Sequence, residues 1–192
     1  MQFLRTTDPF HTESWSLEAT TNPYRVFALC FYHAGHIHEF RKWLLHLFLY
    51  IEQFEVQTEI PSFQLCCAFM AIDSVIDAAH YIHINNLEPD REVDLSIIAD
   101  DAFPGQRRFA SYFIEEEQGD IRKVIEKFFA YQTCDEWKSS MHLVLYHGVT
   151  DRAIDVEMDE FSVWYYLMKL LEAAYIQSRG AVIYPLCSLD DM

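Results

Sequence analysis

The segment between residues 61 and 84 constrains the fold most, because its side chains are apolar on nearly every side of a helix. It opens with Pro61, which suits a first helical turn, where a backbone N–H has no partner. A helix that is apolar all round is typical of the centre of a bundle. The positions that we expect in the core are Leu65, Ala68, Phe69, Ile72, Val75, Ile76, Ala79 and Ile82.

Two other long segments show the helical period. Residues 24–54 have apolar side chains in alternating steps of four and three, which predicts one helix with a single buried stripe. This stripe comprises Val26, Cys30, His33, Ile37, Phe40, Leu44, Leu47, Ile51 and Phe54. Residues 155–179 have acids at the start, Arg179 at the end and Gly180 behind it, all favourable at helix termini. Two adjacent seams are predicted there, Phe161, Trp164, Met168, Leu171 and Tyr175 beside Val163, Leu167, Leu170 and Ala174.

Shorter helices are expected between these segments. Residues 106–118 form one, and residues 120–132 form another with Asp120 as its N-cap. Thr133 and Glu136 have the spacing of a capping box, which predicts a helix that ends near Gly148.

Turn chemistry for β-hairpins is scarce in this chain. Its 192 residues include only five glycines and six prolines, and no two-residue Asn-Gly or Asp-Gly turn joins two periodic segments. We therefore predict an all-α, single-domain bundle of five or six helices. Residues 1–23 are expected to be irregular, 85–105 to form an acidic connector, and 181–192 to form a short tail.

Charge and composition narrow the function. The chain has 30 acidic and 14 basic side chains, a net charge of -16 and 16% aromatic residues. So many aromatic residues exclude a disordered acidic chain, and the negative field disfavours nucleic acid and anionic membranes as partners. The five cysteines form no Cys-x-x-Cys pair, and the N-terminus has no apolar signal region. We expect a cytoplasmic protein without a membrane segment or cofactor.

Acidic side chains concentrate in two places, which we predict to bind a basic protein, because complementary charge accelerates encounter and rejects wrong partners. Surface Tyr and Trp would supply the anchors of such an interface. The hypothesis is an inhibitor or immunity-type protein that neutralises a basic nuclease or toxin, or mimics nucleic acid. A homodimer is a further expectation. The predicted contact residues are Glu115, Glu116, Glu117, Asp120, Asp155, Glu157, Asp159 and Glu160.

One alternative is a nuclease. Arg41 and His46 are separated by four residues, and this element is similar to the Arg-x4-6-His element of HEPN-type helical ribonucleases. The resemblance implies that Arg41 stabilises phosphate charge and that His46 acts in acid–base cleavage of RNA without a metal.

A second alternative is a metal centre in the bundle. His33, His36 and Glu39 repeat every three residues, and Asp77 and His80 have carboxylate-x-x-His spacing. Such pairs on facing helices hold metals in di-iron bundles.

Overall fold

The computed structural model describes residues 13–53, 61–89, 112–113, 117, 120–150 and 158–178. These residues form helices and no strand, so the all-α prediction is confirmed. The helices within the described part are α1 (Glu13–Ala19), α2 (Pro23–His33), α3 (Ile37–Gln53), α4 (Ser62–Asn85), α6 (Ile121–Tyr131), α7 (Cys134–Val149) and α8 (Glu160–Ser178).

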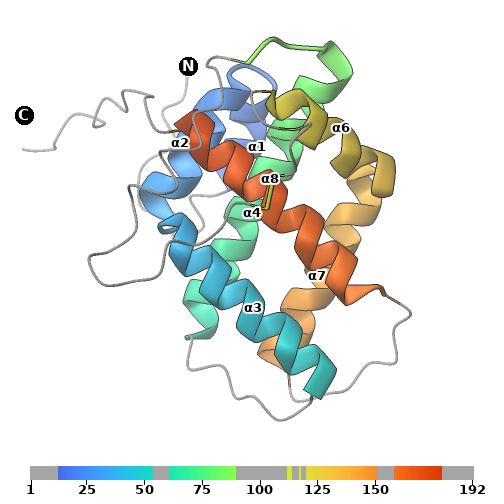
Figure 1. The fold of residues 1–192 in the computed structure, drawn as a ribbon. Coiled ribbons are helices and arrows are strands. Elements are labelled where there is room, and N and C mark those ends of the chain that lie inside the picture. The colour runs from blue at the N-terminus through green and yellow to red at the C-terminus, as the bar shows by residue number, and fades with distance from the viewer. Residues whose placement is uncertain are drawn as a thin grey trace, which may run out of the picture.

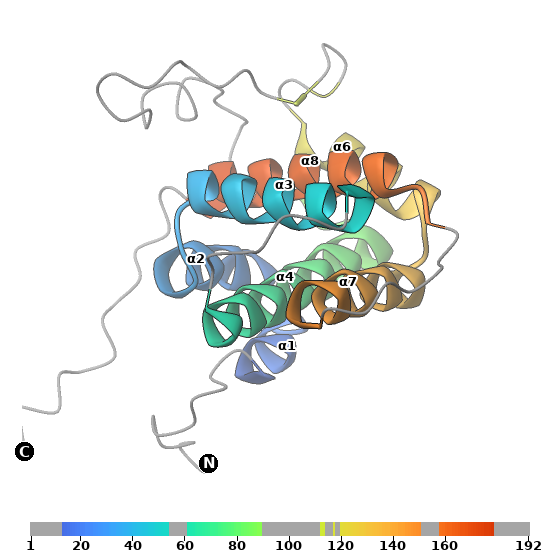
Figure 2. The same cartoon turned by 90° about the horizontal axis from the view of Figure 1, so that it is seen from below.

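The helices pack in layers around α4 (Figure 1). Figure 2 shows α3 and α8 side by side above a second layer of α2, α4 and α7, with α1 beneath α4 and α6 beside α8. Every core position that the sequence predicted for α4 is buried, from Leu65 to Ile82. The all-round apolar pattern of this helix is explained by neighbours on all sides, namely α1, α2, α6, α7 and α8.

The length and composition of Phe63–Asn85 would also allow this part of α4 to cross a membrane. In the structure, 61% of its most apolar stretch is buried by other helices. A buried core helix in a protein without any membrane segment can have the same length and composition, so this feature is weak evidence for membrane insertion.

The prediction of one helix over 24–54 is wrong, because α2 and α3 are separate helices. Gly35 lies between them with a φ of +141°, a backbone conformation that residues other than glycine rarely adopt. The Glu39 carboxylate accepts a hydrogen bond from the His36 backbone N–H at 2.8 Å and so satisfies a free donor at the start of α3.

The predicted stripe of α2 and α3 is largely buried, although His33 is exposed. The side chain of Ile51 and all of Phe54 lie outside the described part. The prediction that residues 1–23 are irregular is wrong for α1. Trp15 and Ala19, one turn apart, give this short helix a buried face against α4 and α2.

The predicted caps of α6 and α7 are confirmed. The Asp120 side chain accepts a hydrogen bond from the backbone N–H of Arg122, and Thr133 and Glu136 form a complete capping box. The predicted helix at 106–118 lies outside the described residues except for Tyr112, Phe113 and Glu117. The tail at 181–192, and the connector beyond residue 89, also lie outside them.

Helix α8 is buried from residue 167 to residue 177 on every side. The predicted second seam is buried, and in the first seam Met168, Leu171 and Tyr175 are buried. In the same seam Trp164 is partly exposed, and Phe161 is exposed over 72% of its surface. The two seams are covered within one chain, by α2, α3, α4 and α6. The width of the two seams therefore needs no second subunit to explain it, and the homodimer stays a prediction.

Candidate binding surface

Six aromatic rings form a connected surface where the start of α8 meets the end of α6. We call this group the aromatic surface; it comprises Tyr112, Tyr131, Phe161, Trp164, Tyr165 and Tyr166. Neighbouring rings have centroids 4.8 to 6.4 Å apart. Phe161 and Tyr131 are exposed, and the other four rings are partly exposed.

Helical periodicity within α8 and packing of other segments against α8 together explain why these rings gather. Tyr165 lies one turn beyond Phe161, so the two rings lie on the same face of α8. Tyr166 is stacked on Tyr131 at 4.8 Å, which joins α8 to the last turn of α6. Tyr112 meets Trp164 edge to face at 5.3 Å. Residues from three separate parts of the sequence thus build one apolar face.

The indole N–H of Trp164 is buried beneath this surface. In the described structure its Nε1 has no hydrogen-bond partner. Buried tryptophan N–H groups usually find an acceptor, so this donor is an unusual feature of the site.

Two of the predicted partner-binding acids adjoin the aromatic surface at the start of α8. Asp159 is exposed, and its carboxylate accepts a hydrogen bond from the backbone N–H of Ser162 at 3.1 Å. Hydrogen bonds from the Ser162 hydroxyl and from its backbone N–H lower the pKa of Asp159, which therefore stays ionised at neutral pH. Glu160 follows it, half-buried in the first helical turn. Both carboxylates lie at the positive end of the helix dipole.

The two described residues of the other predicted patch, Glu117 and Asp120, are both paired with cations. Glu117 is fully buried, and its carboxylate contacts Lys169 Nζ at 2.5 Å and Lys127 Nζ at 3.2 Å. Including Glu117 among the partner-binding residues was therefore wrong. Asp120 is paired with the Arg122 guanidinium at 3.1 Å, and hydrogen bonds from Arg122 lower its pKa. Glu115, Glu116, Asp155 and Glu157 lie outside the described residues.

Sequence reasoning missed a row of buried polar side chains along α8. Lys169, Glu172 and Tyr175 follow each other at intervals of three residues, and each has a polar partner on another part of the chain. Lys169 pairs with Glu117, and Tyr175 contacts the His36 ring nitrogen Nε2 at 2.6 Å. Glu172 forms an ion pair with Arg41 and also accepts a hydrogen bond from the Tyr112 backbone N–H at 3.0 Å. We call these three side chains and their partners the buried polar row.

The residues of the nuclease alternative point in different directions. Arg41 is only 7% exposed and pairs with the fully buried Glu172. His46, on the same helix, is exposed. An arginine in a buried ion pair is not available to a phosphate on the surface, so this geometry does not favour RNA cleavage.

The residues of the metal alternative are engaged separately. His33 contacts the Trp15 ring, the Glu39 carboxylate caps α3, and His80 contacts the Phe129 ring. Asp77 pairs with Lys138 at 2.5 Å. The described ranges bring no three His, Cys, Asp or Glu side chains together as a metal site.

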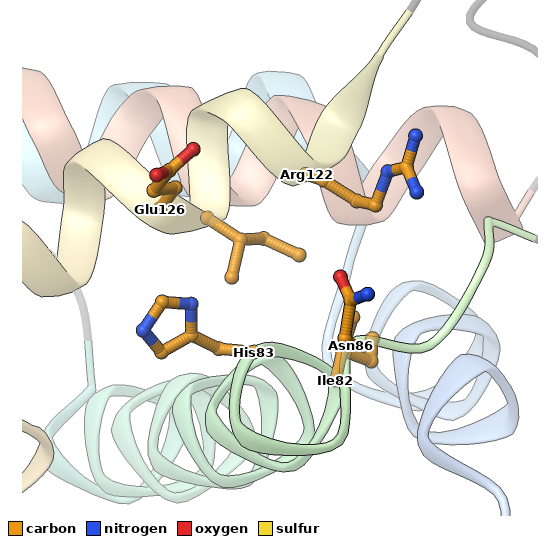
Figure 3. Close-up of a pocket in the computed structure, with 6 residues that line it drawn as sticks. Ile82, His83, Asn86, Arg122 and Glu126 are labelled. Atoms are coloured by element: carbon orange, nitrogen blue, oxygen red, sulfur yellow. The ribbon is translucent and has the colours of Figure 1, made fainter.

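A hollow of about 190 Å³ lies between the end of α4 and the start of α6 (Figure 3). Its lining residues are Ile82, His83, Asn86, Arg122, Ile125 and Glu126. The cation in this lining, Arg122, is already paired with Asp120 and with Glu88, the latter at 2.8 Å. The charge available to a ligand there is therefore small, and the aromatic surface is the stronger candidate site.

Comparison of the chain with known protein families, curated proteins and solved structures gave no match. The function must therefore be argued from the surface itself.

A pair of carboxylates between α4 and α7 gives a pH-dependent prediction. Asp73 contacts His142 Nε2 at 3.2 Å, yet burial raises the pKa of Asp73 despite the opposing effects of His142 and Lys138. Ionised Asp73 therefore costs stability above its folded-state pKa, and this cost vanishes as the pH falls below the unfolded value of about 3.9. Asp73→Asn should raise the free energy of unfolding by up to about 1 kcal/mol at pH 7.5 and leave it unchanged near pH 3.

Urea denaturation at the two pH values measures this difference. The matched variant Asp77→Asn removes the partner of Lys138 and should lower the stability at pH 7.5. A loss of stability in Asp73→Asn at pH 7.5 would show that the ion pairs outweigh burial.

Proposed function

We propose that this protein binds and inhibits a basic protein, such as a nuclease or toxin, through the aromatic surface and the carboxylates beside it. The observation that carries the proposal is the exposure of Phe161 and Tyr131 within a connected group of rings. Monomeric proteins rarely expose contiguous apolar patches without a function.

The chemistry of the surface suits protein recognition. Tyrosine and tryptophan are enriched among residues that dominate binding energy, because a rigid ring buries a large area at little cost in conformational entropy. Four of the six rings are Tyr or Trp with partly exposed surfaces. Each also has ring neighbours that hold it in place before a partner arrives.

Charge supports a basic partner. The chain has a net charge of -16, and Asp159 and Glu160 lie next to Phe161 in the sequence. Negative charge of this size accelerates the approach of a positively charged protein and excludes acidic competitors.

Site-specific photo-crosslinking tests the proposal. A photoreactive phenylalanine analogue is placed at Phe161 in the cells that make the protein, and a matched probe is placed at Leu17, which is 73% exposed on α1. We expect a basic protein to be captured at position 161 and not at 17. Its complex with the full chain should weaken steeply between 50 and 300 mM salt. Salt screens exposed charges at the rim of an interface, because the Debye length is only about 10 Å at 0.1 M.

The double variant Phe161→Ala/Tyr165→Ala should weaken that complex by about 30-fold or more, the loss expected for hot-spot rings. Leu17→Ala should leave the affinity unchanged. Capture of an acidic protein, equal capture at both positions, or full affinity in the double variant would refute the proposal.

A further inference from the structure

The rings of Phe161 and Tyr165 are parallel but stand apart. Their planes differ by 8° and their centroids are 6.4 Å apart. In the core, Phe128 and Trp137 are parallel to within 7° with centroids only 3.9 Å apart, which is direct face-to-face contact. The surface pair therefore has the orientation of stacked rings without their closeness.

We propose that Phe161 and Tyr165 together form a binding site for an arginine side chain of the partner, whose planar guanidinium stacks against these rings. This inference rests on the proposed function, since it specifies how a basic partner is recognised on the aromatic surface. It also predicts a preference for arginine over lysine at this position.

The preference follows from the chemistry of the two cations. A guanidinium is planar and weakly hydrated, and it stacks on aromatic faces, whereas an ammonium is a compact and strongly hydrated charge. Rings of the aromatic surface already interact with cations of this chain. Arg41 Cζ lies 5.6 Å from the centroid of Tyr112, and Lys169 Nζ lies 5.0 Å from that of Tyr165.

Local charge favours a second cation at the pair. Lys169, which lies over the Tyr165 ring, pairs with Glu117 at 2.5 Å, and Lys127 contacts the same carboxylate at 3.2 Å. Asp159 and Glu160 precede Phe161, and Asp159 is exposed and ionised. The charges of these described side chains, two lysines and three carboxylates, therefore sum to -1. This negative charge attracts a guanidinium, and the exposed Asp159 carboxylate offers it hydrogen-bond acceptors.

The test compares two peptides of equal charge, one alternating glycine with arginine and the other glycine with lysine. Each is titrated into the full chain while the ring resonances of Phe161 and Tyr165 are followed by NMR. We expect the arginine peptide to shift both sets of resonances and to bind about three-fold more tightly, as an exposed cation–π contact predicts.

Phe161→Leu keeps an apolar side chain but removes the ring, and it should abolish the arginine preference by weakening the arginine peptide more than the lysine peptide. Tyr32→Leu, at a 62% exposed ring on α2, is the matched control and should keep the preference. Equal affinities for the two peptides, or ring resonances that do not move, would overturn this inference. Capture of a basic protein at position 161 would still support the proposed function in that case, so the two failures are distinguishable.

Discussion

Replacing Glu172 by glutamine should lower the free energy of unfolding by about 3–5 kcal/mol, because it breaks a buried ion pair while leaving the cation in place. Glu172 is completely buried, and Arg41 is 7% exposed. Water cannot solvate the Arg41 guanidinium in place of the lost carboxylate. For a chain of this length such a loss lowers the melting temperature by about 10 °C, which thermal unfolding followed by circular dichroism measures directly.

Two further variants separate buried charge from ordinary loss of contacts. Arg41→Met/Glu172→Leu removes both charges and should recover most of the stability, since apolar replacements of buried ion pairs are often neutral or better. Arg25→Met breaks the exposed pair with Glu18, at 3.2 Å, and should cost less than about 1 kcal/mol. If Glu172→Gln lowered the free energy of unfolding no more than Arg25→Met, burial of the Arg41–Glu172 pair would not increase its contribution to stability.

Sequence patterns predicted the parts of the fold that depend on local or strongly periodic signals. The α4 core was readable because almost every residue between Leu65 and Ile82 is apolar. The caps at Asp120 and Thr133 were readable because a cap involves a side chain and a backbone N–H within three residues.

The parts that were not predicted depend on distant partners. Glu117 and Lys169 are separated by 52 positions, and Arg41 and Glu172 by 131, so no local pattern indicates that these charges are buried together. The break at Gly35 was missed because the apolar stripe continues in register through it. The available signal for this break was Gly35, together with Glu39 placed three positions after His36, where its carboxylate can cap a new helix.

The candidate site was predicted only in part. The sequence indicated acids at the start of α8 and a role for surface aromatic residues, and it placed Phe161 in a buried seam. Phe161 lies outside the core because it is in the first turn of α8, before the helix becomes buried on all sides at residue 167. The stack of Tyr166 on Tyr131 depends on how α6 packs against α8, which helical periodicity does not specify.

Trp137→Ala should be the most damaging single truncation in the corner between α6 and α7, with a loss of about 3–5 kcal/mol. The Trp137 side chain is fully buried and stacks on Phe128 at 3.9 Å. Its indole N–H donates a hydrogen bond to the Phe128 carbonyl oxygen at 2.9 Å. Truncation removes the stack, the hydrogen bond and the volume that supports the last turn of α6.

Trp137→Phe divides these contributions. It keeps a ring against Phe128 but loses the hydrogen bond, and the carbonyl still accepts a bond from the Gln132 backbone N–H at 3.4 Å. The expected cost is therefore about 1–2 kcal/mol, measured by urea denaturation beside Trp137→Ala. Equal losses in the two variants would assign the stability of the corner to the hydrogen bond and not to packing.

The same pair of variants connects this corner to the aromatic surface. The ring centroids of Tyr131 and Trp137 are 6.0 Å apart, and Tyr131 is stacked on Tyr166. A cavity at Trp137 therefore removes the support beneath one exposed ring. Under conditions where both variants are folded, Trp137→Ala should weaken partner binding several-fold, whereas Trp137→Phe should keep it. Phe161→Ala should weaken partner binding but leave the free energy of unfolding nearly unchanged, because a 72% exposed ring contributes little to the core. Binding that stays unchanged in Trp137→Ala would show that Tyr131 is not part of the interface.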